Sequence, residues 1–363
     1  MGILVFRADA SLDIGTGHIM RCLTLAKALS GNEQRCIFIC REHPGNLIEI
    51  INDAGFEVFT LPAGPNAAGN SHKDWLGADW QTDAEQTRDA LQGLVVDWIV
   101  VDHYAIDANW ERAMRPSCKR LMVIDDLADR PHDCDLLLDQ NLGHTVEEYA
   151  GLVPKACRLL VGSKYAMLRP EFAQLREFSL KRRANPSLDH ILITMGGVDQ
   201  NNATGQVLEA LKSSTLPENC RITVVMGPHA PWLNEVAKIA AAMPWEVDVK
   251  VSVNNMAKLM ADSDLAIGAA GSTAWERCCL GLPCVTLVLA DNQSEIASAL
   301  SDVGATIKLE DTVGAHFGIE LNRIISDISN NLNILENGSR LAASVTNGSG
   351  SGLVVVNILD ANK

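Results

Sequence analysis

A glycine-rich turn between a predicted strand and a predicted helix constrains this chain most. The turn lies in residues 13–21, after the apolar run 3–6 and before apolar residues at helical spacing over 19–29. Glycines let a backbone bend tightly and let a ligand approach, and a helix N-terminus favours negative charge. His18 begins this helix, where an imidazole can exchange protons near neutral pH. Glycines of this kind also occur for packing alone, so the turn by itself leaves catalysis open.

Alternating apolar runs and helical patterns predict the architecture. The first half has predicted strands at 3–6, 36–40, 57–61, 98–102, 120–124 and 136–138. A second series has predicted strands at 191–195, 222–226, 247–251, 265–268, 284–288 and near 306. Helical patterns between them indicate parallel sheets covered by helices. The sequence therefore predicts an α/β protein with two Rossmann-like parallel-sheet domains and a ligand cleft between them.

The chain length supports this division, because 363 residues exceed one ordinary domain. We place the N-terminal domain at residues 1–165 and the C-terminal domain at 166–345. A tail follows at 346–363, and the sequence leaves open whether it packs back on the N-terminal domain.

Polar residues follow several predicted strands, at the edge where parallel sheets bind ligands. Asp102, His103 and Tyr104 end one strand, and Asp125 and Asp126 end the next. A structural alternative for Asp102 is that it caps a helix beginning near residue 107.

The segment 62–81 lacks periodicity and contains Trp75 and Trp80. Long loops of this kind are often functional. Its tryptophans either stack on a ligand or anchor the loop to the core.

A second glycine-rich turn follows the predicted strand 265–268. The backbone of Gly271, with the hydroxyls of Ser272 and Thr273, is suited to hold phosphate oxygens. Thr273 and Glu276 also have the spacing of a capping box, so Glu276 has a structural alternative to a binding role.

The composition excludes some classes of partner. A formal net charge of −15 argues against a nucleic-acid partner. No apolar run reaches the roughly 18 residues of a membrane span, and no signal peptide is evident, so we expect a cytoplasmic protein without a membrane partner. Ten scattered cysteines without a Cys-x-x-Cys pair indicate free thiols rather than disulfides or a zinc site.

Several motifs together resemble one family. They lie at residues 6–21 (Phe-Arg-x-Asp to Gly-x-Gly-His-x-x-Arg), 74–77, 102–104, 162–170 and 195–197. In these the chain resembles the UDP-sugar hydrolases of pseudaminic acid synthesis. The run 268–293 is similar to the murein N-acetylglucosaminyltransferases, which have the GT-B fold. The resemblance extends to about residue 345 and implies a GT-B fold for the chain.

The resemblance also implies a reaction. Water would displace UDP from UDP-2,4-diacetamido-2,4,6-trideoxy-β-L-altropyranose at the anomeric carbon, with inversion. No Asp-x-Asp-type metal requirement is evident in the sequence, so we expect catalysis without a divalent ion or other cofactor. The family's catalytic base matches His18. On this basis we assign substrate binding to Gly17, Tyr104, Arg169, Asn292 and Gln293. We assign UDP binding to Gly196, Met256, Gly271, Ser272, Thr273 and Glu276.

Two questions about the base stay open in the sequence. His103 supplies a second imidazole near His18. The helix N-terminus disfavours the imidazolium, which a nearby carboxylate such as Asp13 or Asp9 would help to stabilise.

Three other functions compete with hydrolysis. A GT-B glycosyltransferase would pass the sugar to an acceptor, a binding module would hold a UDP-sugar without turnover, and a UDP-sugar 2-epimerase would return a UDP-linked sugar. The oligomeric state is open, with a monomer as one alternative.

Overall fold

The computed structural model describes residues 2–64, 72–228, 230–290, 293–309 and 315–361, and they form two compact units. Unit 1 comprises Met1–Met167 and Ser349–Lys363, and unit 2 comprises Leu168–Gly348. The boundaries expected from the sequence were 165/166 and 345/346, against 167/168 and 348/349 in the structure.

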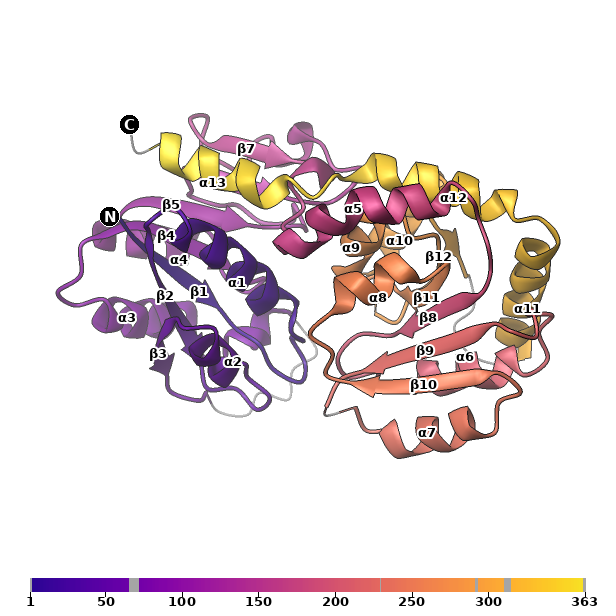
Figure 1. The fold of residues 1–363 in the computed structure, drawn as a ribbon. Coiled ribbons are helices and arrows are strands. Elements are labelled where there is room, and N and C mark those ends of the chain that lie inside the picture. The colour runs from indigo at the N-terminus through magenta and orange to yellow at the C-terminus, as the bar shows by residue number, and fades with distance from the viewer. Residues whose placement is uncertain (1, 65–71, 229, 291–292, 310–314, 362–363) are drawn as a thin grey trace. The chain divides into compact units, whose positions relative to one another are not determined.

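Unit 1 contains a seven-stranded parallel sheet in the order β3-β2-β1-β4-β5-β6-β7, of which Figure 1 labels every strand except β6. Its strands are β1 Ile3–Ala8, β2 Arg35–Arg41, β3 Glu57–Leu61, β4 Val96–Asp102, β5 Cys118–Ile124, β6 Leu136–Asp139 and β7 Arg158–Val161. The central strands are buried on both faces, which is why they read as continuous apolar runs. The sequence did not predict β7, because this edge strand has four residues and only one is fully buried.

The register of β1 and β4 positions the candidate site. Ala8 pairs with Asp102, so both strands end at the same level of the sheet. The turn that follows β1 and the polar residues that follow β4 therefore lie at one edge, as in other parallel α/β sheets.

Helices cover both faces of this sheet. They are α1 Gly17–Ser30, α2 Ile48–Asp53, α3 Trp80–Ala90, α4 Ala108–Met114 and α13 Gly350–Asp360. Short 3-10 helices are η1 His72–Leu76, η2 Arg115–Ser117, η3 Val146–Tyr149 and η4 Ser163–Tyr165. The C-terminal helix α13 shares a core with α1, since Val354 and Ile358 belong to the same buried cluster as Ile19 and Leu23.

Unit 2 contains a six-stranded parallel sheet in the order β10-β9-β8-β11-β12-β13. Its strands are β8 His190–Thr194, β9 Arg221–Met226, β10 Glu246–Val251, β11 Leu265–Ala269, β12 Cys284–Leu287 and β13 Ile307–Lys308. Its helices are α5 Pro170–Arg183, α6 Ala203–Leu211, α7 Leu233–Ala241, α8 Met256–Asp262, α9 Thr273–Cys279, α10 Ser294–Asp302, α11 Ala315–Asn330 and α12 Asn333–Val345. The sequence did not predict α7, which buries only Val236 and Ala240 fully. The two parallel-sheet units confirm the predicted Rossmann-like architecture.

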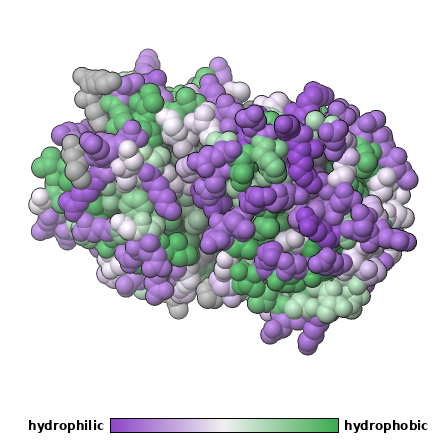
Figure 2. Space-filling model, in the orientation of Figure 1, coloured by the Kyte–Doolittle hydropathy of each residue, from purple (hydrophilic) through white to green (hydrophobic). Residues whose placement is uncertain are grey.

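The surface is mixed in character. On the face shown in Figure 2, hydrophobic patches are interrupted by hydrophilic residues. The most exposed large apolar side chains come from separate elements: Val95, Ile319, Leu12 and Val356. Among the described residues, no helix has the length and hydropathy of a membrane span. The ten cysteines are all free, as predicted.

Candidate functional site

His18 and Asp102 form a close pair at the carboxyl edge of the unit 1 sheet. The turn before α1 contains Gly15 at φ +78°, a conformation that glycine adopts without strain. His18 Nδ1 lies 2.6 Å from Asp102 Oδ1, and both side chains are buried. Asp102 does not cap α4, because Asp107 accepts that helix's N-terminal N–H bond from Asn109. The structural alternative for Asp102 is therefore wrong.

Arg21 holds the other side of Asp102. Its Nε donates to Oδ2 at 2.6 Å, and its Nη2 donates to Oδ1 at 2.7 Å. Burial alone would raise the pKa of the Asp102 carboxyl, but Arg21 and His18 hold that pKa well below its usual range. Asp102 is thus a carboxylate at neutral pH and a constant acceptor for His18.

Tyr104 and Asp126 complete this cluster. Arg21 Nη1 donates to Asp126 Oδ2 at 2.9 Å. The Tyr104 ring meets the His18 ring edge-on, with centroids 4.7 Å apart. Burial, together with the Asp126 carboxylate, raises the pKa of Tyr104 above its usual value, so its hydroxyl keeps its proton. Tyr104 is therefore a hydrogen-bond donor beside the candidate base.

An aromatic group extends from Tyr104 into η1. Trp75 stacks on Tyr104 with centroids 5.8 Å apart and an interplanar angle of 25°. The His72 ring contacts both rings, with its centroid 4.5 Å from that of Trp75 and 5.1 Å from that of Tyr104. These contacts agree with the anchoring alternative for Trp75, and its contact with a ligand stays a prediction.

His103, the second imidazole, lies in a different setting from His18. It is 3% exposed, and its Nδ1 accepts a hydrogen bond from the Ala105 N–H. Its Nε2 lies 3.4 Å from Asp9 Oδ2, and burial lowers the pKa of His103. Asp9 in turn pairs with Arg7 at 2.8 Å.

The carboxylate beside His18 is therefore Asp102, rather than Asp9 or the exposed Asp13 that the sequence suggested. The sequence placed Asp102 at the end of a strand but did not pair it with His18. Sequence proximity favoured residues 9 and 13, whereas the partner is 84 residues away and arrives through strand pairing.

In unit 2, hydrogen bonds from Arg277 hold the glycine-rich turn in place. This buried side chain donates to the Ala269 carbonyl at 2.8 Å and to Thr273 Oγ1 at 3.2 Å. Gly268 is required by packing, since a Cβ there would lie 2.7 Å from the Thr194 carbonyl oxygen. A Cβ at Gly271 would instead meet no atom within 4 Å, so the turn itself has room beside it.

Glu276 does not form the capping box that its spacing allows. The structure shows no side-chain cap at the start of α9. The Glu276 carboxylate instead lies 3.3 Å from Arg169 Nη2, and Arg169 also reaches Glu171 at 3.2 Å. Burial raises the pKa of Glu276, and Arg169 opposes that shift. Two residues assigned from different motifs thus meet within unit 2.

The other assigned residues of unit 2 follow strand ends. Gly196 follows β8 with φ +90°, and the half-buried Met256 opens α8 after β10. Gln293 Oε1 accepts the Leu289 N–H at 3.0 Å. Gly17 opens α1 in unit 1. Asn292 lies outside the described residues.

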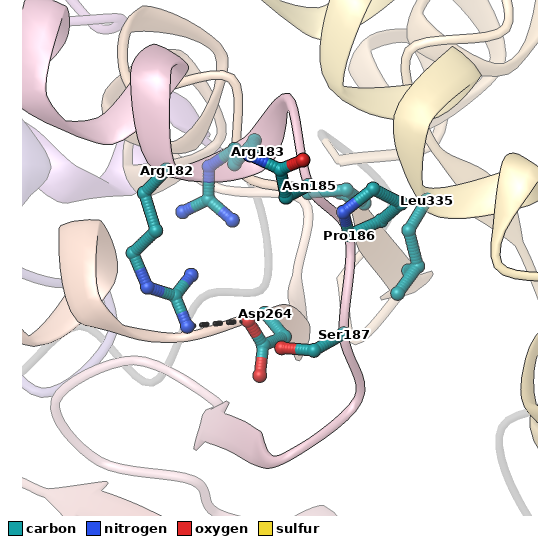
Figure 3. A pocket seen from close by; sticks show the side chains of 8 residues that line it. Arg182, Arg183, Asn185, Pro186, Ser187, Asp264 and Leu335 are labelled. Carbon is teal, nitrogen blue, oxygen red and sulfur yellow. Dashed lines mark hydrogen bonds and ion pairs between the residues drawn. The ribbon is translucent and has the colours of Figure 1, made fainter.

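A pocket elsewhere in unit 2 does not coincide with these residues. Arg182, Arg183, Asn185, Pro186, Ser187, Asp264, Pro283 and Leu335 line it (Figure 3). Asp264 directly precedes β11, so the pocket lies near the amino ends of the strands, away from the glycine-rich turn. Arg182 is paired with Asp264, and Arg183 donates to the carbonyls of Met260 and Ser263. Burial lowers the pKa of Arg183 to about 9.

Among the described residues, no group of three or more His, Cys, Asp or Glu side chains is arranged to hold a metal ion.

Comparison with known proteins gives three kinds of similarity. Residues 190–343 match the family described as Glycosyltransferase family 28 C-terminal domain. A UDP-2,4-diacetamido-2,4,6-trideoxy-beta-L-altropyranose hydrolase from Campylobacter jejuni is 25% identical over 84% of this chain and 98% of its own length. An uncharacterized protein from Methanocaldococcus jannaschii is 27% identical over 79% of this chain, which spans 56% of that relative's length.

Among solved structures, MurG from Acinetobacter baumannii has a TM-score of 0.71 with 16% identity, covering 99% of this chain and all of that one. At this identity the likeness concerns the fold, and it confirms the predicted GT-B class. The cleft between the two domains stays a prediction.

Proposed function

We propose that this protein hydrolyses UDP-2,4-diacetamido-2,4,6-trideoxy-β-L-altropyranose to UDP and the free sugar, by attack of water at the anomeric carbon with inversion. The observation that carries the proposal is the 2.6 Å contact between His18 Nδ1 and Asp102 Oδ1. The Campylobacter jejuni relative, which carries the name of this activity, supports the choice of substrate.

The pair provides the base that water needs. When Nδ1–H donates to Asp102, His18 Nε2 keeps its lone pair and can accept a proton. The water oxygen forms a bond to the anomeric carbon while its proton passes to Nε2. The bond from that carbon to the phosphate oxygen breaks, and its electron pair leaves with UDP. The ionised Asp102 then stabilises the imidazolium.

Unit 2 is proposed to bind the leaving group. The turn at Gly271, Ser272 and Thr273 would donate N–H and hydroxyl groups to the diphosphate. Glu276 would accept hydrogen bonds from the ribose hydroxyls, with Arg169 favouring its ionised form. Gly196, which follows β8, and Met256, which opens α8 after β10, would also contribute.

The sugar is proposed to contact residues from both halves of the sequence. Gly17 and Tyr104 lie around His18 in unit 1, while Arg169 and Gln293 belong to unit 2. Asn292 keeps its role as a proposal based on the family resemblance.

Glycosyl transfer is the second candidate. It is favoured by the match of residues 190–343 to a glycosyltransferase domain. Both activities need the same bound UDP-sugar and the same leaving group, and they differ in whether water or an acceptor hydroxyl attacks.

Incubation of the UDP-sugar in ¹⁸O-labelled water without an acceptor separates these functions. Hydrolysis at the anomeric carbon places the label in the free sugar and none in UDP, as mass spectrometry would show. Label in UDP would mean attack at phosphorus and would refute the role of His18. Turnover only after an acceptor is added would establish a transferase, and a returned UDP-linked isomer an epimerase. UDP binding without any turnover would indicate a binding module.

A further inference from the structure

Arg21 belongs to the unit 1 cluster but is not among the residues to which the family resemblance assigned a role. It lies three residues after His18 on α1, so both side chains project from the same helix face. Its guanidinium makes three hydrogen bonds of 2.6–2.9 Å to two carboxylates, Asp102 and Asp126. Asp102 is the last residue of β4, and Asp126 comes shortly after the neighbouring strand β5. The arginine thus connects three elements at the candidate base.

The contact with Asp102 fixes the orientation of the carboxylate. Oδ1 accepts from His18 Nδ1 at 2.6 Å and from Arg21 Nη2 at 2.7 Å, while Oδ2 accepts from Arg21 Nε. A planar guanidinium that bonds both oxygens holds the carboxylate plane, which a lysine cannot do. Rotation of the Asp102 carboxylate away from His18 would break its hydrogen bond with His18 and both of its hydrogen bonds with Arg21.

The charges of the cluster also suit a proton acceptor. With a neutral His18, the two carboxylates and one guanidinium sum to −1. Uptake of a proton by His18 brings the sum to zero. Asp126 therefore offsets the charge of Arg21, so that the imidazolium forms beside an uncompensated carboxylate despite its position at a helix N-terminus.

We propose that Arg21 is a positioning residue for His18. It holds the Asp102 carboxylate toward Nδ1, fixes the tautomer that leaves Nε2 as acceptor, and does not itself touch the substrate. The effect on rate rests on the proposed hydrolysis, whereas the effect on the tautomer does not.

Arg21→Lys tests this proposal, with Arg130→Lys as the matched control. Arg130 is another largely buried arginine of unit 1, and it pairs with Asp125, the neighbour of Asp126. We expect Arg21→Lys to lower kcat by about 10- to 100-fold, because a small misplacement of a reacting group has effects of this size. KM and the Kd for UDP should stay within about twofold. Arg130→Lys should leave kcat within about twofold of the wild type.

The imidazole ¹⁵N spectrum of His18 provides a readout that needs no substrate. The wild type should show the Nδ1–H tautomer, and Arg21→Lys should show a mixture of tautomers. A wild-type spectrum and a wild-type kcat in folded Arg21→Lys would overturn the proposal. Absence of turnover in the wild type would instead refute the proposed function, while the spectrum would still test Arg21.

Asp126→Asn is the second variant, for the case that Arg21→Lys does not fold. It keeps the fork between Arg21 and Asp102, and its amide oxygen can still accept from Arg21, but it removes the negative charge that offsets Arg21. We expect a decrease in kcat of about two- to tenfold with unchanged KM, and a visible minor tautomer. An unchanged kcat together with an unchanged spectrum would overturn the proposal in this variant as well.

Discussion

The two glycine-rich turns have similar sequences and different surroundings. In unit 1 the turn at residues 15–18 leads into α1, a helix of 14 residues whose His18 contacts the strand-end Asp102. In unit 2 the turn at 268–273 leads into α9, which has seven residues and is held by Arg277 through a backbone carbonyl and a hydroxyl.

The difference lies in the charge that each turn meets. Carboxylates converge on the start of α1, and an anionic diphosphate would be repelled there, whereas a base that gains a proton is stabilised. At the start of α9 the turn is held by the buried side chain of Arg277, and the space beside Gly271 is open. We infer that similar strand–turn–helix segments have taken different tasks, the base in unit 1 and the leaving group in unit 2.

Substitution of the base should give the largest effect. His18→Ala removes the proton acceptor, and we expect kcat to fall by about 10²- to 10⁴-fold while UDP still binds. Turnover and calorimetric UDP binding measure the two halves of this prediction. His144→Ala is the matched control, since His144 Nδ1 also lies 2.6 Å from a strand-end aspartate, Asp139. Equal losses in both variants would contradict the assignment of the base to His18.

Asp102→Asn should have the next largest effect. Asparagine keeps the shape of the side chain but cannot stabilise the imidazolium, so we expect kcat to fall by about 10²- to 10³-fold with little change in UDP affinity. A normal kcat would show that His18 acts without its carboxylate, and the division of tasks between the turns would lose its basis.

The same variant predicts a change in the pH dependence of stability. Arg21 and His18 hold the pKa of folded Asp102 below its unfolded value of about 3.9, despite the opposing effect of burial. Its contribution to stability is therefore present above that value and is lost as the pH falls through the folded pKa. The stability difference between the wild type and Asp102→Asn should shrink below about pH 4, which urea titrations at several pH values can measure.

Glu276→Gln tests the other turn. Because a hydrogen bond to a charged group contributes about 1.5–3 kcal/mol, we expect UDP affinity to fall by about 10- to 100-fold. Glu171→Gln is the control, since Glu171 also contacts Arg169 but is more exposed. Burial raises the pKa of Glu276, so wild-type UDP affinity should decrease with falling pH sooner than an ordinary glutamate would cause. An unchanged affinity in Glu276→Gln would remove Glu276 from the UDP site.

The sequence predicted those features that depend on neighbouring residues. Buried parallel strands appear as apolar runs, and the turn before His18 is visible in its glycines. It could not predict contacts that depend on strand order. Asp102 reaches His18 because β4 pairs with β1, and Glu276 meets Arg169 across 107 residues of sequence. For Glu276 the local pattern was misleading. Thr273 and Glu276 have the spacing of a capping box, but the Glu276 carboxylate contacts Arg169 and does not cap α9.

Trp75→Ala should have the smallest effect and separates the two alternatives for the loop before α3. If Trp75 anchors the loop, loss of its stacking on Tyr104 costs about 1 kcal/mol, lowers Tm by a few degrees and reduces kcat a few-fold through Tyr104. If Trp75 stacks on the sugar, KM rises while Tm stays constant. In either case UDP affinity should not change, because the proposed UDP site belongs to unit 2.

Trp80→Ala is the control, since Trp80 is the first residue of α3 and is exposed. A large loss of UDP affinity in Trp75→Ala would contradict the separation of base and leaving group, since an unit 1 side chain would then contribute to nucleotide binding.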